Sequence, residues 1–119
     1  LERRHFNNKP IASHQLVQAE LAGMAYEITK GQTLALHIGR LKDKNKANFA
    51  QISMLKDNNA CMARDIARRS RELMGANGIT DDYPFGRHIT NLETVVTYEG
   101  THNMHLLNVG KELTGISAF

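Results

Sequence analysis

Apolar and small residues recur at alternating spacings of four and three between positions 17 and 38, and this periodicity constrains the fold most. Side chains with this spacing lie on one face of an α-helix. The positions are Val17, Leu21, Met24, Ile28, Gly31, Ala35 and Ile38. We expect the helix to begin after Ser13, a candidate N-cap, and to end near Leu41, with a length of roughly 40 Å. Glycines within it predict close backbone packing or a kink: Gly23, Gly31 and Gly39.

A second long helical pattern follows a polar turn at residues 42–46 and continues to Leu73. Pro84 suits the first turn of a shorter helix through about Glu93. The β-branched run at residues 94–97 is expected to resist regular helix, and a last helix is expected from its N-cap Thr101 through Leu113. These patterns predict an all-α fold, an antiparallel up-and-down helical bundle of two long helices with shorter ones laid against them.

Length and composition allow one domain, residues 1–119. The chain begins at Leu1 and has neither a signal peptide nor a long apolar run, so we expect a soluble fragment without a membrane partner. The formal charge of +3 decides little about partners, because the cations are scattered among acids and are not gathered in a tail. The single Cys61 has no intrachain partner for a disulfide, and its neighbours favour a buried, inert thiol in a reducing compartment.

Two features, one basic and one glycine-rich, each leave two interpretations open. Arg64, Arg68 and Arg71 share a helix face, either as a solvated stripe supported by an Arg68–Glu72 pair or as a phosphate contact. Residues 75–78, Gly-Ala-Asn-Gly, are either a helix-ending turn or a place where a ligand phosphate or another backbone approaches closely.

His102 and His105 are spaced i, i+3 and could in principle bind a metal ion. We find no Cys, Asp or third His arranged with them in the sequence pattern, and the remaining histidines form no better group. We therefore expect no metal site.

Glu99 stands between the β-branched run and the last helix, followed by Gly100 and the candidate N-cap Thr101. A carboxylate in this place is either an ordinary helix-start acid that interacts with the helix dipole or a base. Burial would raise its pKa and backbone N–H donors would lower it, so the surroundings could tune it.

Four segments, in this order and approximate spacing, resemble the C-terminal helical domain of acyl-CoA dehydrogenases: Arg3-Arg4-His5-Phe6, His14-Gln15, Gly75-Ala76-Asn77-Gly78 and Tyr98-Glu99-Gly100-Thr101. The chain is most similar to the glutaryl-CoA dehydrogenase branch, through residues 39–43, 87–88, 91–93, 97–102 and 114–119. The resemblance spans nearly the whole chain.

The resemblance implies FAD as cofactor, Glu99 as the catalytic base that removes the α-proton of an acyl thioester, and a backbone N–H of Glu99 that polarises the thioester carbonyl. Tyr98 and Gly100 would contact the substrate beside Glu99. It implies these cofactor-binding residues: Arg3, on the FAD pyrophosphate, Phe6, Gln15, Gly75, Ala76, Gly78 and Thr101. Two positions depart from the common family pattern, Glu72 for Gln and Ala76 for Gly.

The resemblance further implies a longer subunit with an N-terminal helical and a middle β domain, assembled as a tetramer. Its substrate would be an acyl-CoA, which the similarity to the glutaryl branch narrows to glutaryl-CoA, and an electron-transfer flavoprotein or similar acceptor would take the electrons. We expect a cytoplasmic protein in a bacterium and a mitochondrial matrix protein in a eukaryote. Two other classes stay open: a helical interaction module without flavin, and nucleic-acid binding through the arginine stripe, which ranks last.

Overall fold

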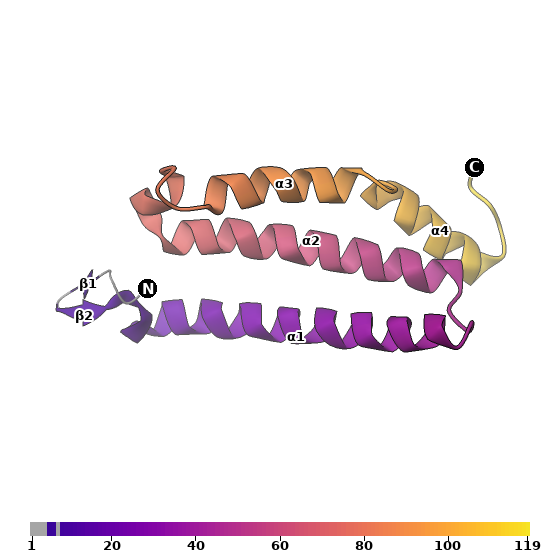
Figure 1. The fold of residues 1–119 in the computed structure, drawn as a ribbon, viewed down its shortest axis with the longest axis horizontal. Helices are drawn as coiled ribbons and strands as arrows, with labels where there is room; N and C mark the ends of the chain where they lie inside the picture. Colours follow the sequence, from indigo (N-terminus) through magenta and orange to yellow (C-terminus); the bar gives the residue numbers. More distant parts are fainter. Residues whose placement is uncertain (1–4, 7) are drawn as a thin grey trace.

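The computed structural model describes residues 5, 6 and 8–119, and most of them are helical. The long helices α1 (Gln15–Asp43) and α2 (Phe49–Leu73) run antiparallel, and α3 (Phe85–Thr97) runs antiparallel to α2 (Figure 1). After a bend, α4 (His102–Thr114) continues onward from α3 instead of reversing direction. The predicted all-α antiparallel bundle is therefore confirmed, and α4 extends it in the direction of α3.

Short elements lie at the same end of the bundle as the start of α1. The two-residue strands β1 (His5–Phe6) and β2 (Lys9–Pro10) pair antiparallel, and the 3-10 turn η1 (Ile11–Ser13) leads into α1. A second 3-10 turn, η2 (Gly75–Ile79), follows α2. Lys9 and Pro10 are thus part of a minimal hairpin.

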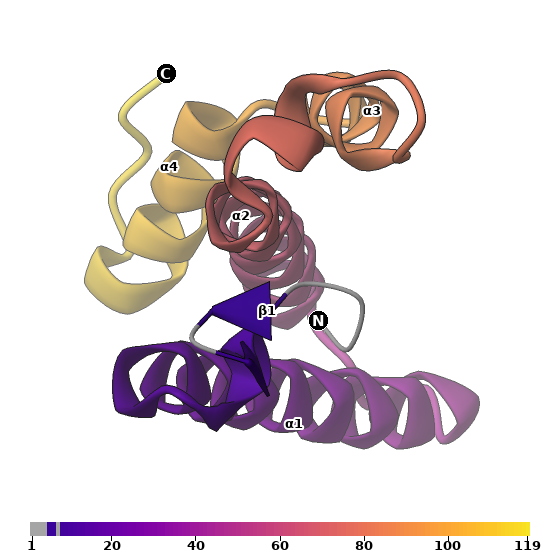
Figure 2. The same ribbon diagram turned by 90° about the vertical axis from the view of Figure 1, so that its left-hand side faces the viewer.

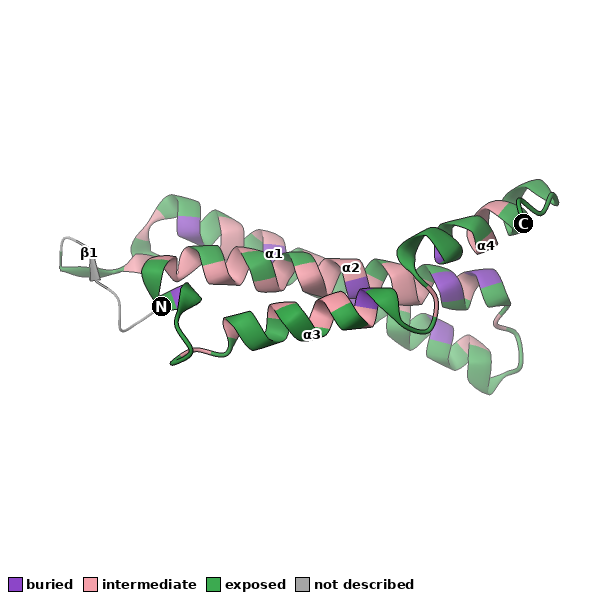
Figure 3. Ribbon diagram, turned by 90° about the horizontal axis from the view of Figure 1, so that it is seen from above, coloured by how far each residue is buried: buried purple, intermediate pink, exposed green. Residues whose placement is uncertain are grey.

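The helix α2 is the centre of the molecule, because α1, α3 and α4 all pack on it (Figure 2). Buried residues lie where the helices face one another, and the outer faces of α1, α3 and α4 are exposed (Figure 3). The buried positions of α1 recur every seventh residue: Val17, Met24, Gly31 and Ile38. This stripe is narrower than expected, since Ile28 is 39% exposed and Ala35 is exposed. The reason is that α1 packs chiefly on one helix.

Helices α1 and α2 approach each other closely at Gly31. A Cβ added there would lie 2.7 Å from the Met62 Cε atom and 2.9 Å from the Asn59 Oδ1 atom. The Asn59 side chain donates a hydrogen bond to the Gly31 carbonyl oxygen at 3.1 Å. Gly31 therefore confirms the close packing predicted from the glycines, whereas an added Cβ at Gly39 would meet open space.

Three predicted boundaries differ from the structure. The N-cap of α1 is His14 and not Ser13, which belongs to η1. The run at residues 94–97, expected to resist helix, is the last turn of α3. The Thr97 hydroxyl donates to the Glu93 carbonyl at 2.7 Å, and Val96 is buried. Hydrogen bonding one turn back and burial of Val96 outweigh the small propensity cost of β-branched residues. Pro84 likewise lies at the N-cap, one residue before the first turn of α3.

The predicted arginine stripe is an interhelical ion-pair cluster. Arg64 and Arg68 on α2 both pair with Glu93 on α3, at 3.6 Å for Arg64. Glu72, expected to pair with Arg68, lies 3.5 Å from Arg71 instead. These arginines therefore form ion pairs within the bundle. The stripe no longer favours a phosphate or nucleic-acid contact.

Among the described residues, no helix combines the length and hydropathy that crossing a membrane requires.

Candidate active site

Residues 98–101 form a tight loop that joins α3 to α4. Tyr98 caps α3 in an extended conformation, and the loop then takes two consecutive positive φ angles, 55° at Glu99 and 101° at Gly100. A positive φ at a residue with a side chain costs free energy and clusters at functional sites. Thr101 then starts α4, accepting a hydrogen bond from the Met104 N–H at 3.4 Å, which confirms the predicted N-cap.

The left-handed backbone presents Glu99 outward. Its side chain is exposed, as is Tyr98 at 53%. Within the described part of the chain, neither the Glu99 carboxylate nor its backbone N–H has a hydrogen-bond partner. One residue thus offers a proton acceptor and an unsatisfied N–H donor side by side. This pair can serve a reacting carbonyl compound, because the donor can bind the oxygen while the carboxylate takes a proton from the adjacent carbon.

Lys56 holds this loop to α2. Its ammonium group donates to the Gly100 carbonyl oxygen at 2.7 Å and to the Val96 carbonyl oxygen at 3.2 Å. The side chain is part-buried, so the two charge-assisted bonds are shielded from solvent and fix both sides of Glu99. Sequence reasoning missed Lys56, because its partners are backbone atoms 40 and 44 residues further along the chain.

Gly100 is required by both its backbone angle and its neighbour. A Cβ at this position would lie 3.0 Å from the Nε2 atom of His105, and φ is in the region that favours glycine. His105 is buried, at 7% exposed, and its ring nitrogens have no hydrogen-bond partner among the described residues. The ring of His105 thus packs directly against Gly100.

The predicted cofactor residues lie elsewhere. Gln15 is exposed at the start of α1, and η2 lies at that same end of the bundle, away from the α3–α4 loop (Figure 1). Thr101 is the one cofactor candidate of the described chain that adjoins Glu99. Arg3 lies outside the described residues, and for Phe6 only the backbone, in β1, is described.

Within residues 75–78 the structure separates two roles. Gly75 has a φ of 56° and ends α2 in the left-handed conformation, as predicted. Gly78 is buried, and an added Cβ would lie 2.3 Å from the Arg71 carbonyl oxygen, so its small size serves a close backbone approach within the chain. Ala76 is exposed beside Gly75. Gly75 and Ala76 therefore remain open to a ligand, and a cofactor contact at Gly78 stays a prediction.

The expectation that no Cys or Asp lies with His102 is wrong. Asp57 and Cys61 on α2 meet His102 at the first residue of α4. His105, the other predicted partner, points under Gly100 instead.

Residues 1–114 match the family model of the acyl-CoA dehydrogenase C-terminal domain. A probable short/branched chain specific acyl-CoA dehydrogenase from Dictyostelium discoideum is 30% identical over 113 residues, which are 95% of this chain and 27% of the relative.

Two solved structures carry the same fold. The glutaryl-CoA dehydrogenase of Mycobacterium smegmatis, in complex with FADH2, is 49% identical with a TM-score of 0.94, over 99% of this chain and 31% of that one. A chain in a structure of the electron transferring flavoprotein of Acidaminococcus fermentans is 26% identical with a TM-score of 0.90, over 95% of this chain and 30% of that one.

The chain thus spans less than a third of the length of these proteins. Over nearly all of its own length, it belongs to the acyl-CoA dehydrogenase family and corresponds to the C-terminal domain of that family.

Proposed function

We propose that the protein containing this chain is an FAD-dependent acyl-CoA dehydrogenase in which Glu99 is the catalytic base. The observation that carries the proposal is the geometry of Glu99, an exposed residue on a left-handed turn whose carboxylate and backbone N–H have no hydrogen-bond partner among the described residues. Family membership supports it. Free Glu has a pKa of about 4.3, so the base needs the apolar, water-poor surroundings that a bound acyl chain would supply.

In this proposal the chain's own residues handle the proton and the thioester. The Glu99 N–H binds the thioester oxygen and stabilises the negative charge that develops there, while the carboxylate takes the α-proton. Tyr98 and Gly100 border the acyl chain on either side of Glu99, and Lys56 keeps the loop in place. Bound FAD would supply what no side chain here can, acceptance of a hydride from the β-carbon.

The described cofactor candidates fit FAD in part. Gly75 and Ala76 carry at most a methyl group at an accessible bundle end, so an extended dinucleotide could approach their backbone. Gln15, exposed at the same end, offers an amide. We propose that Arg3, Phe6, Gly78 and Thr101 also contact FAD, and that other domains and a neighbouring subunit of a tetramer complete each cofactor site.

Within the family we propose glutaryl-CoA as substrate, because the M. smegmatis glutaryl-CoA dehydrogenase is 49% identical. Loss of the α-proton and the β-hydride converts glutaryl-CoA into glutaconyl-CoA. Breaking the bond between the γ-carbon and its carboxylate then releases CO2 and leaves the bonding electron pair on the crotonyl fragment. Protonated Glu99 can return its proton to the γ-carbon, which gives crotonyl-CoA.

The electron acceptor and the location are further parts of the proposal. We propose an electron-transfer flavoprotein or a similar acceptor, located in the cytoplasm of a bacterium or in the mitochondrial matrix of a eukaryote.

The test uses the full-length protein. It should purify yellow, and its flavin absorbance should bleach on anaerobic addition of an acyl-CoA. A panel of glutaryl-, butyryl-, isobutyryl- and octanoyl-CoA identifies the branch, and mass analysis of the products shows whether CO2 leaves. Crotonyl-CoA from glutaryl-CoA supports the full proposal. Bleaching by monoacyl thioesters alone would move the protein to another branch. A colourless protein that no acyl-CoA affects would support a helical interaction module instead.

A further inference from the structure

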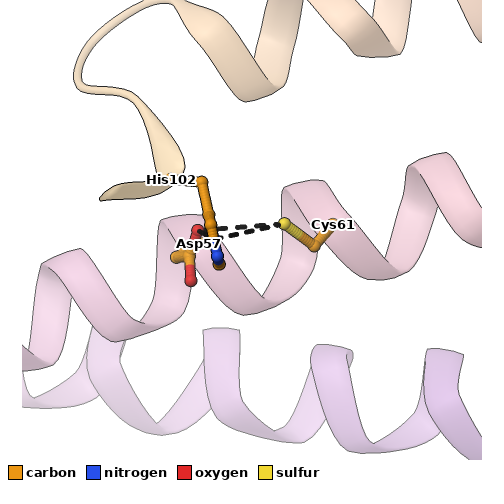
Figure 4. A group of neighbouring side chains, drawn as sticks. All are labelled: Asp57, Cys61 and His102. Atoms are coloured by element: carbon orange, nitrogen blue, oxygen red, sulfur yellow. Dashed lines mark hydrogen bonds and ion pairs between the residues drawn. The ribbon is translucent and has the colours of Figure 1, made fainter. Parts of the chain in front are cut away.

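Three donor atoms of different chemistry meet where α2 passes the start of α4 (Figure 4). Asp57 and Cys61 are one helical turn apart on α2, so both point to the same side. The Asp57 Oδ1 atom lies 2.7 Å from His102 Nδ1, and Cys61 Sγ lies 3.8 Å from each of these two atoms. A carboxylate, a thiol and an imidazole therefore form a triangle built from two helices.

The triangle is close to the size that a tetrahedral metal ion requires. Zinc bonds of about 2.0–2.3 Å at tetrahedral angles place donor atoms roughly 3.3–3.6 Å apart. The pair formed by Asp57 and His102 would have to open, and the sulfur would have to move inward, by roughly 0.3–0.6 Å. The His102 side chain is 48% exposed and the Asp57 side chain 17%, so small side-chain rotations suffice.

The surroundings favour a cation. The three residues line a surface hollow of about 500 Å³ that also contains Glu27 and Asp65. Two charged residues of this hollow are already paired at 2.6 Å, Glu27 with Lys30 and Arg69 with Glu20. Asp65 has no ion pair among the described residues, so it adds negative charge beside the triangle. Burial and the neighbouring Asp57 carboxylate raise the pKa of the Cys61 thiol, which argues against a free nucleophilic thiolate here.

We propose that Asp57, Cys61 and His102 bind Zn²⁺, with a fourth coordination position open to solvent. A mixed sulfur, nitrogen and oxygen set favours zinc over magnesium or calcium, which prefer oxygen donors alone. The bound ion would tie α2 to the first residue of α4, three positions after Glu99. It would thus hold the loop in place together with the contacts of Lys56 to the Val96 and Gly100 carbonyls. The site does not depend on the proposed function.

The experiment titrates the chelator-stripped full-length protein with Zn²⁺ in competition with a chromogenic chelator. A second readout maps alkylation of Cys61 by mass spectrometry with and without Zn²⁺. The test variants Cys61→Ser and His102→Gln each remove one donor with little change of size. Asp43→Asn and His37→Gln are matched controls, because both residues are exposed and neither lines the hollow or belongs to the triangle. Circular dichroism verifies the fold of each variant.

We expect the wild-type protein to bind one zinc ion per chain, and the bound ion to protect Cys61 from alkylation. The affinity for zinc should fall at least tenfold in both donor variants and stay unchanged in both controls. Saturable binding that Cys61→Ser and His102→Gln leave intact would overturn the proposal, and so would the absence of binding by the stripped wild-type protein. Equal alkylation of Cys61 with and without Zn²⁺ would overturn it too, even where a donor variant fails to fold.

Discussion

At the scale of single residues, the loop between α3 and α4 depends on a glycine that nothing else can replace without strain. Gly100 combines a φ of 101° with the His105 ring 3.0 Å from where a Cβ would lie. We expect Gly100→Ala to lower the free energy of unfolding by about 1–3 kcal/mol, the usual cost of a strained backbone position. Denaturant unfolding measures this.

Gly110→Ala is the matched control for Gly100→Ala. Gly110 lies within α4, and an added Cβ would meet open space. Alanine there should raise the free energy of unfolding by up to about 1 kcal/mol through helix propensity. Equal effects of the two substitutions would show that the loop carries no special constraint.

Lys56 is the second residue on which the loop depends. We expect Lys56→Met, which keeps the length of the stem but leaves the Val96 and Gly100 carbonyls without their donor, to speed hydrogen exchange of the hydrogen-bonded amides that border the loop. These are the amides of Tyr98, which donates to the Thr94 carbonyl at 2.9 Å, and of His105, which donates to the Thr101 carbonyl at 3.1 Å. Hydrogen bonds to a charged group contribute about 1.5–3 kcal/mol, so exchange that proceeds by local opening should accelerate by about tenfold or more. Lys111→Met, at an exposed lysine of α4, should leave these amides unchanged. Unaltered exchange in Lys56→Met would contradict the role of Lys56.

At the scale of elements, the start of α2 is fixed by a reciprocal cap. The Asn48 side chain accepts from the Gln51 N–H at 2.8 Å, and the Gln51 side chain accepts from the Asn48 N–H at 2.9 Å. Asn48 also donates to Glu112 on α4 at 3.1 Å. Because α2 is the centre of the bundle, we expect Asn48→Ala to lower the melting temperature, at a cost of about 0.5–2 kcal/mol. Asn91→Ala, at an exposed site within α3, is the control and should cost less.

The elements were predictable where the cause is local. Apolar spacing and turn residues are enough for the two long helices, the left-handed Gly75 and the N-cap Thr101. The error at residues 94–97 has a physical cause, because propensity is a weak term that burial of Val96 and threonine hydrogen bonds override.

The missed features share another cause. The contacts of Lys56 with the loop depend on the axial position of α2 relative to α3 and α4, and so does the proximity of Asp57, Cys61 and His102. Periodicity within one helix carries no information on that register, and so neither contact could be predicted from the chain.

At the scale of the whole molecule, the bundle is elongated and its core is thin. Its extents are 58 × 24 × 24 Å, and several large apolar side chains are more than two-thirds exposed: Leu16, Tyr26, Phe49, Ile79, Leu113, Ile116 and Phe119. Extended apolar surface of this kind generally finds a partner. We expect the 119-residue chain alone to self-associate, in a two-fold dimer as the commonest closed symmetry.

The isolated chain should also hold no FAD, because in our proposal it supplies only part of each cofactor site. Sedimentation velocity and the absorbance of the purified chain measure these two expectations. A monodisperse monomer would contradict the self-association, and stoichiometric bound flavin would contradict the incomplete cofactor site.

The role of Glu99 as base is tested most directly by single-turnover flavin bleaching of the full-length Glu99→Gln variant. The amide is nearly isosteric but takes no proton, so the rate with saturating acyl-CoA should fall by about 10²–10⁴-fold, with flavin content and melting temperature unchanged. Glu27→Gln, at a surface ion pair with Lys30, should keep the wild-type rate. The bleaching rate of Glu99→Asp should lie between those of Glu99→Gln and the wild type. Bleaching by Glu99→Gln at a near-wild-type rate would contradict the assignment.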